Sequence, residues 1–326
     1  NGSSGVDFTT WLNNTFSGLN NLHLMMNIGS RLIAAQGLTV DLSNTGISTI
    51  FPTSVIGSIS GTDYKTFMLH RSNLTVDQAV NLDNSGDAYN NLEIAGSSIT
   101  NNNTITGTKD AQTAMAQKTY GKNVVLTNTG TINLSGKEST AMYTKKTDAA
   151  TGTLTNSGTI NVGDKSTAMY GINNVVFSNT GTINIGSDST AMYYTDKEGS
   201  TVYNTTTGLS NAGIITSSGN NSMAMSYQDG NITGTPIFEN TSTGTITMTG
   251  DKNIGMYALK ANAGSYTTKN SGTITLGNST ELNNPNVAIY TNSATVGTNP
   301  IENTATITVG NNAIGIYGNE VNQSGN

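Results

Sequence analysis

Few residues of this chain carry side chains that enzymes use for proton transfer or nucleophilic attack. The sequence has two histidines, His23 and His70, no cysteine, and 20 Asp and Glu among 326 residues. A serine hydrolase would need a nucleophile in a turn such as GxSxG, which does not occur. A zinc site would need clustered His, Cys or acidic ligands. We therefore expect no enzyme, no metal and no cofactor.

The acidic residues follow turn chemistry rather than catalytic chemistry. Polysaccharide hydrolysis needs paired carboxylates on one surface. Asp164, Asp188 and Asp251 instead follow Gly or Ser in short turn sequences, where Asp is common. The positions that should face outward in the intervening strands are almost all Thr or Asn and never ionisable, as at Thr131 and Asn133.

A repeat of variable length must position these residues. It reads LTNTGTINLSGKESTAMY at 126–143, LTNSGTINVGDKSTAMY at 154–170 and FSNTGTINIGSDSTAMY at 177–193, with more divergent copies from about residue 99 to the C-terminus. Each copy holds three short runs with period-two alternation, which is typical of strands and not of helices. Three strands per repeat predict one coil of an all-β, right-handed parallel β-helix.

Aligned columns of the repeat identify the expected interior. The first strand should bury residues such as Leu126 and Phe177, and the second should bury Ile132, Ile160 and Ile183. One asparagine per coil falls on the inner side at a bend, where a buried amide needs partners. Coils stacked about 4.8 Å apart allow these amides to bond to each other. We expect an asparagine ladder of Asn128, Asn156, Asn179, Asn211, Asn240, Asn270 and Asn303.

The third strand is expected to point Thr140 and Met142 inward and to place Ala141 and Tyr143 outside. The outer tyrosine column could bind sugar rings or a protein partner. Alternatively, the rings pack under loops or against each other, which is the interpretation we favour. The column would contain Tyr143, Tyr170, Tyr193, Tyr257, Tyr290 and Tyr317.

Insertions between the third strand of one coil and the first of the next offer a second candidate surface. The segments 194–208 and 228–236 are the long ones, and loops on a rigid scaffold often carry recognition. The candidate binding residues there are Tyr194, Lys197, Glu198, Tyr203 and Asp229.

The composition limits the classes of binding partner and indicates the domain organisation. The formal charge is −6 with only 14 Lys and Arg, so nucleic acid binding is not expected. No apolar run is long enough to insert in a membrane.

Large apolar groups near Trp11 predict an N-terminal cap over 1–69, followed by the β-helix over 70–326. The C-terminus lacks a capping signal, so we expect the array to continue beyond it. We also expect a monomer.

The coil motif NxGTINxG…STAMY, with the block HRSNLTVDQAVNLDNSGDAYNNLEIAGSSITNNNTITGTKDAQ at 70–112, resembles the passengers of large fusobacterial type V autotransporter adhesins. The arginine-inhibitable (RadD-like) and galactose-inhibitable groups are their best-known sets. The resemblance covers most of the chain from about residue 60. It implies an upstream signal peptide, a C-terminal outer-membrane barrel beyond this sequence, and a cell-surface location. It further implies coaggregation with other bacteria and binding of host-cell glycans or immune receptors.

The sequence therefore predicts an adhesin passenger that displays binding loops on a rigid rod. The alternative is a structural stalk that only projects a distal binding tip. Binding of the isolated chain to cells would separate the two.

Overall fold

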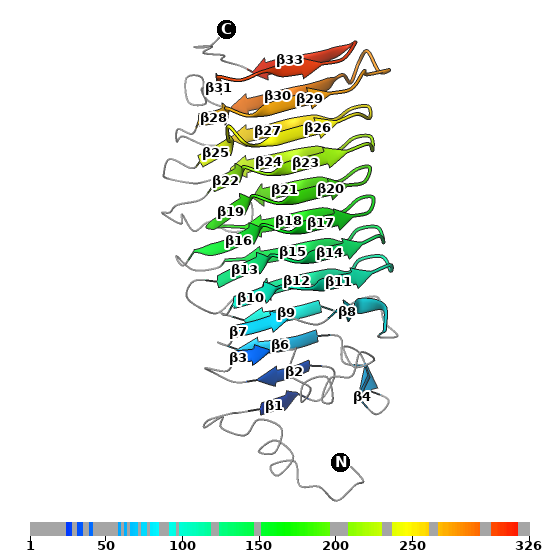
Figure 1. Ribbon diagram of the computed structural model, residues 1–326, viewed down its shortest axis with the longest axis vertical. Helices are drawn as coiled ribbons and strands as arrows, with labels where there is room; N and C mark the ends of the chain where they lie inside the picture. The colour runs from blue at the N-terminus through cyan, green and yellow to red at the C-terminus, as the bar shows by residue number, and fades with distance from the viewer. Residues whose placement is uncertain are drawn as a thin grey trace, which may run out of the picture.

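The chain folds as a right-handed parallel β-helix with three strands per coil, stacked into a rod (Figure 1). The computed structural model describes residues 24–27, 31–34, 39–41, 58–59, 62–63, 66–70, 73–76, 79–84, 91–95, 98–118, 124–146, 151–195, 208–229, 237–260, 267–293 and 301–318. Three long sheets, here called sheets I, II and III, run along the rod and take the first, second and third strand of each coil.

Sheet I contains β3 (Thr39–Asp41), β7 (Asn73–Val76), β10 (Ser98–Asn101), β13 (Val124–Asn128), β16 (Gly152–Asn156), β19 (Val175–Asn179), β22 (Gly208–Asn211), β25 (Ile237–Asn240), β28 (Thr267–Asn270) and β31 (Ile301–Asn303). Sheet II contains β8 (Val80–Asn81), β11 (Thr104–Gly107), β14 (Thr131–Leu134), β17 (Thr159–Val162), β20 (Thr182–Ile185), β23 (Ile214–Ser217), β26 (Thr245–Met248), β29 (Thr273–Leu276) and β32 (Ile307–Val309).

Sheet III contains β1 (Leu24–Asn27), β2 (Arg31–Ala34), β6 (Thr66–His70), β9 (Asn91–Ala95), β12 (Thr113–Lys118), β15 (Thr140–Lys145), β18 (Thr167–Ile172), β21 (Thr190–Thr195), β24 (Met223–Asp229), β27 (Ile254–Lys260), β30 (Asn286–Ser293) and β33 (Ala313–Gly318). A 3-10 turn, η1 (Leu82–Asn84), follows β8, and β4 (Ser58–Ile59) pairs antiparallel with β5 (Thr62–Asp63).

Coils stack without a register shift over the regular part of the rod, so like residues fall above like. Ile132 pairs with Ile160 and Ile160 with Ile183 along sheet II. Every second residue of these strands is buried, which is the alternation that predicted them. The core is therefore one continuous column of aliphatic and aromatic side chains.

The asparagine ladder runs along the bend between sheets I and II. Asn128 Nδ2 donates to Asn156 Oδ1 at 2.8 Å, and Asn156 Nδ2 donates to Asn179 Oδ1 at 2.8 Å. The same bond recurs at every later coil and also links Asn101 to Asn128. Each amide between the two ends of the ladder thus receives a partner from the coil on either side, and the bend repeats the same geometry.

A second buried ladder follows the turn between sheets II and III, and sequence reasoning did not anticipate it. The backbone N–H of Ser139 donates to Ser166 Oγ, and that of Ser166 donates to Ser189 Oγ, each at 3.0 Å. The column continues with Ser222, Asn253 and Asn286. These bonds join each turn to the turn of the next coil and so hold successive turns in register.

The third strand departs from the expected alternation. Ala168 is completely buried in the core, as are its counterparts Ala141, Ala191, Ala224 and Ala288. A Cβ added to Gly255, in the same column, would lie 3.2 Å from Ile274 Cγ2. The expectation that this column faces outward is therefore wrong. Two successive residues, Ala168 and Met169, point inward because the strand is irregular where it leaves the turn, and its pairing passes from Thr167 directly to Met169.

Apart from Val287, which is 7% exposed, the residue before each small residue of this column is only partly buried. Thr140, Thr167 and Thr190 are only partly buried, and so are Met223 and Ile254 further along the column. The methionines that follow the alanines are fully buried, as predicted. The outer face of sheet III therefore carries a column that changes from threonine to aliphatic residues toward the C-terminal coils.

Parallel stacking reaches further toward the N-terminus than the range predicted for the β-helix. β2 pairs with β6 in sheet III and β3 pairs with β7 in sheet I, both parallel. β1 pairs antiparallel with β2 at the end of sheet III. Trp11 and its apolar neighbours, from which the cap was predicted, lie outside the described residues.

Candidate functional site

The turn between sheets II and III is unusually long at one coil. The connection from β29 to β30 takes nine residues, 277–285, whereas that from β26 to β27 takes five, 249–253. Most of the short turns contain one residue with positive φ, such as Asp188 at 56° and Lys252 at 59°. The long turn forms a loop that projects from the side of the rod (the orange loop in Figure 1).

Hydrogen bonds and an ion pair hold this loop against the preceding turn. The Asp251 carboxylate accepts the Thr280 backbone N–H at 2.7 Å and the Thr280 hydroxyl at 2.8 Å. Lys252 Nζ lies 3.4 Å from Glu281 Oε1. At the base of the loop, the fully buried Asn286 donates to the carbonyl of Gly277 at 3.1 Å. The loop is therefore fastened to the rod through residues in its first part, 277–281.

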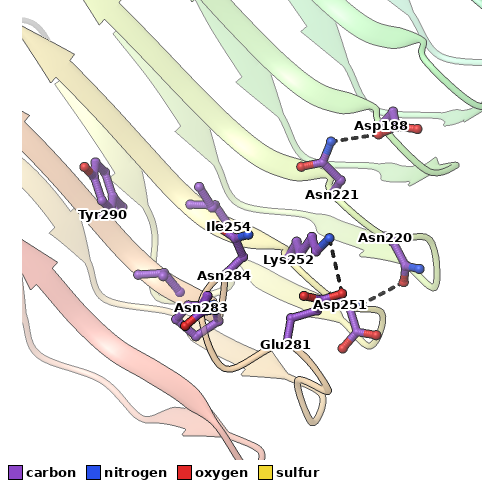
Figure 2. A pocket seen from close by; sticks show the side chains of 12 residues that line it. Asp188, Asn220, Asn221, Asp251, Lys252, Ile254, Glu281, Asn283, Asn284 and Tyr290 are labelled. Carbon is purple, nitrogen blue, oxygen red and sulfur yellow. Dashed lines mark hydrogen bonds and ion pairs between the residues drawn. The ribbon is translucent and has the colours of Figure 1, made fainter.

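The loop, the turns of the three preceding coils and the outer face of sheet III enclose an open groove of about 660 Å³. Figure 2 shows the charged side chains at one end, Tyr290 at the other, and Ile254 between them. The groove is lined by Asp188, Asn220, Asn221, Asp251, Lys252, Ile254, Glu281, Asn283, Asn284, Pro285, Val287 and Tyr290.

The charged end of the groove has an excess of negative charge, because Asp188, Asp251 and Glu281 face one cation, Lys252. The pKa of Asp251 is lowered, chiefly because the backbone N–H of Thr280 donates to its carboxylate, with further help from the Thr280 hydroxyl and the charge of Lys252. Asp188 Oδ1 accepts the side-chain amide of Asn221 at 2.7 Å, as drawn in Figure 2.

The apolar part of the groove comes from the column that the sequence analysis placed inside. Ile254 and Val287 precede the small residue of their strands and line the groove, where Ile254 is partly buried and Val287 is 7% exposed. Tyr290 lies three residues beyond Val287 and is partly exposed. The groove thus joins an aliphatic floor to a rim of amides and carboxylates.

The outer tyrosines form a stacked ladder. The ring centroids of Tyr257 and Tyr290 are 5.3 Å apart with an interplanar angle of 17°, and those of Tyr290 and Tyr317 are 5.1 Å apart at 14°. A similar stack joins Tyr170 to Tyr193, and Ser226 takes the tyrosine position between the two stacks. Ring faces contact neighbouring rings, so the ladder presents edges and hydroxyls to solvent. This is the packing role favoured from the sequence.

The binding candidates proposed at the other corner fare differently. Tyr194 is fully buried, and its ring stacks on that of Tyr227 with centroids 4.9 Å apart. It points inward because it lies one residue beyond the outward Tyr193, so it is unavailable to a ligand, and that candidate is wrong. Lys197, Glu198 and Tyr203 lie outside the described residues, and Asp229 ends β24.

Apart from Tyr290, which belongs to the tyrosine column, the residues that line the groove were not binding candidates in the sequence. The sequence does contain a signal for this loop. The stretch of chain between the buried isoleucine of the second strand and the buried residue that follows the alanine column in the third strand is longer from Ile274 to Ile289 than from Ile246 to Met256. Because the repeat also varies in length between sheets III and I, the total repeat length does not reveal this insertion between sheets II and III.

Two general features bear on the site. No group of three or more His, Cys, Asp or Glu residues is placed to hold a metal ion within the part of the chain that the structure describes. The same part contains no helix of the length and apolarity that a membrane crossing requires.

Comparison with known proteins gives one family match. Residues 88–208, a little over a third of the chain, match the model of the BigA fourth domain. The match supports an adhesin-like bacterial surface protein. It covers coils that precede the groove and the whole coil that contributes Asp188. Neither the curated proteins nor the solved structures yielded a match.

Proposed function

We propose that this chain is the passenger of a bacterial adhesin and that the groove beside the 277–285 loop contacts the partner cell. The observation that carries the proposal is the loop itself. A rod needs only a short turn between sheets II and III, yet this coil has nine residues there, fastened by Asp251, Lys252 and Asn286. A fixed loop that walls a groove on a rigid scaffold is typical of recognition sites.

The finer assignment rests on the 70–112 block and the coil motif. They support a fusobacterial type V autotransporter passenger, anchored in the outer membrane by a C-terminal barrel and acting as a monomer. The proposed partners are host-cell glycans or immune receptors and other bacteria. No catalytic step belongs to this proposal.

The test uses the 326-residue chain, fluorescently labelled, with host epithelial cells, leukocytes and other bacteria. In one variant, the five residues of the 249–253 turn replace 277–285. In a matched control, the same five residues replace 135–139, the turn between β14 and β15. We expect saturable binding by the wild type and the control, and at least a tenfold loss for the groove variant.

Two results would contradict the proposal in different ways. No binding of the wild type to any cell at micromolar concentration would favour the structural stalk. Undiminished binding of the groove variant would place adhesion elsewhere. A further variant that lacks 197–207 and 230–236 would then test the corner between sheets III and I.

A further inference from the structure

The lining of the groove suits one class of ligand. Its floor is aliphatic, from Ile254, Pro285 and the small exposed part of Val287, and its rim carries side-chain amides and carboxylates. A ligand that matches must therefore present apolar C–H groups on one side and many donors and acceptors on the other. A sugar ring has this character, because its axial C–H groups and its hydroxyls occupy different faces and edges.

The available polar groups favour hydroxyls over peptide groups. Asn283 and Asn284 are exposed at the groove, and an amide both donates and accepts, as a hydroxyl does. Asp188 uses Oδ1 for Asn221, and its Oδ2 can accept from a ligand hydroxyl. An extended peptide would instead seek a free strand edge. Sheet III offers its face here, since β27 and β30 are both paired on each side.

The charge of the groove selects among sugars. Asp188, Asp251 and Glu281 outnumber Lys252, and the Lys252 ammonium is engaged by Glu281. A carboxylate or sulfate on the ligand would meet like charge, which costs affinity. An uncharged sugar meets no such penalty.

From these observations, we propose that the groove binds the uncharged end of a glycan. Ile254 and Val287 contact the C–H face of the ring, and Asn283, Asn284 and Asp188 bond to its hydroxyls. The groove volume of about 660 Å³ lies within the usual range for small-ligand sites, roughly 300–1,000 Å³. A short oligosaccharide fits in this volume. The inference rests on the proposed function and specifies its ligand.

The experiment titrates the full chain with immobilised oligosaccharides that end in galactose, glucose, mannose or an N-acetylhexosamine. Sialylated and sulfated forms of the same oligosaccharides are measured in parallel. The variants are Val287→Asp on the floor and the double variant Asn283→Ala with Asn284→Ala on the rim. Val125→Asp, an exposed position on sheet I, is the matched control.

We expect at least one neutral terminus to bind, with affinity at least tenfold lower in both groove variants and unchanged in the control. The acidic forms should bind at least tenfold more weakly than the neutral ones. The inference is overturned if no neutral oligosaccharide binds, if the acidic forms bind more tightly, or if the groove variants bind normally. Because the rim variant alters only exposed loop residues, it remains informative even if Val287→Asp fails to fold. Cell binding that persists without any glycan binding would overturn this inference and leave the adhesive function standing.

Discussion

Lys252 and Glu281 belong to turns of successive coils, and their charged groups lie 3.4 Å apart across the groove wall. Both side chains are substantially exposed, at 38% and 48%, and exposed ion pairs contribute little to stability. Their effect is to orient the 277–285 loop, together with the two bonds from Thr280 to Asp251. The rod supplies the rigidity, and these few polar contacts set the position of the loop.

The contact between Asp251 and Thr280 should depend on pH in a defined direction. Because hydrogen bonds from Thr280 lower the Asp251 pKa below its ordinary value of 3.8, the carboxylate holds the loop fully above about pH 4. This contribution is lost as pH falls through the lowered pKa. Lys252, Glu281 and Asp188 are the charged neighbours at this end of the groove. The amide resonance of Thr280, followed by NMR during acid titration, should shift with a midpoint below 3.8.

The matched variant is Asp251→Asn, which has no titrating carboxylate at this position. Its Thr280 resonance should lack that transition. A wild-type midpoint at or above 3.8 would show that Thr280 does not donate to the ionised Asp251.

Removing one member of the asparagine ladder should destabilise the rod strongly. Asn179→Ala leaves the Asn156 amide without its acceptor and Asn211 Oδ1 without its donor. Each buried group left unpaired costs about 1–3 kcal/mol, so we expect a loss of about 2–4 kcal/mol in the free energy of unfolding. Urea unfolding followed by circular dichroism measures it.

Asn161→Ala is the control for this change. Asn161 belongs to a partly buried ladder on the outer side of sheet II, between Asn133 and Asn184. Water can replace its partners there, so a loss below about 1 kcal/mol is expected. Equal losses for the two variants would mean that the inner ladder has no special energetic role.

The inward position of the alanine column can be tested by enlarging one member. Ala168→Leu would insert three carbon atoms into a fully buried site and should destabilise the chain by about 1–3 kcal/mol through overpacking. The neighbouring Thr167→Leu should be nearly neutral because Thr167 is only partly buried. If Ala168→Leu were neutral instead, the column would face solvent as the simple alternation predicted.

The tyrosine ladder should be visible in alkaline titration. Burial raises the pKa of Tyr257 above 10.0, and the neighbouring Tyr290 and Tyr193 raise it further. A raised pKa means that the folded state favours the neutral phenol, so this contribution to stability is complete below about pH 10 and is lost as pH rises through the raised pKa. Absorbance at the phenolate band measures the ionisation.

Tyr257→Phe should remove one late-titrating phenol from that curve. If the lost component titrates at or below pH 10.0 instead, the ring is not buried in the ladder as described.

Much of the fold was predictable because the β-helix repeats its solution at every coil. A buried isoleucine such as Ile160 pairs with an isoleucine in the coil on either side. Equivalent positions of the aligned repeats therefore stack in the structure. The asparagines were predictable for the same reason, since a buried amide must find a partner and the stack offers one at each level.

The errors arose where local geometry breaks the alternation of the strand. The period-two pattern assigns Thr167 and Met169 to the inner face. Because the strand is irregular where it leaves the turn, Ala168 points inward together with Met169. That shift places Ile254, which is partly buried, and Val287, which is 7% exposed, in the lining of the groove. The inward position of the alanine column could not be inferred from periodicity. The sequence shows a small residue between two larger ones whether the small residue points inward or outward.

Site-specific photo-crosslinking can show whether the groove beside the 277–285 loop touches the partner cell. A photoreactive phenylalanine analogue replaces Asn284 on the groove wall or, as a control, Thr159 on the outer face of sheet II. Each labelled chain is then irradiated on living cells that bind the wild type. We expect a crosslinked cell-surface product from position 284 and none from 159. Equal products from both positions, or a product from 159 alone, would contradict this expectation.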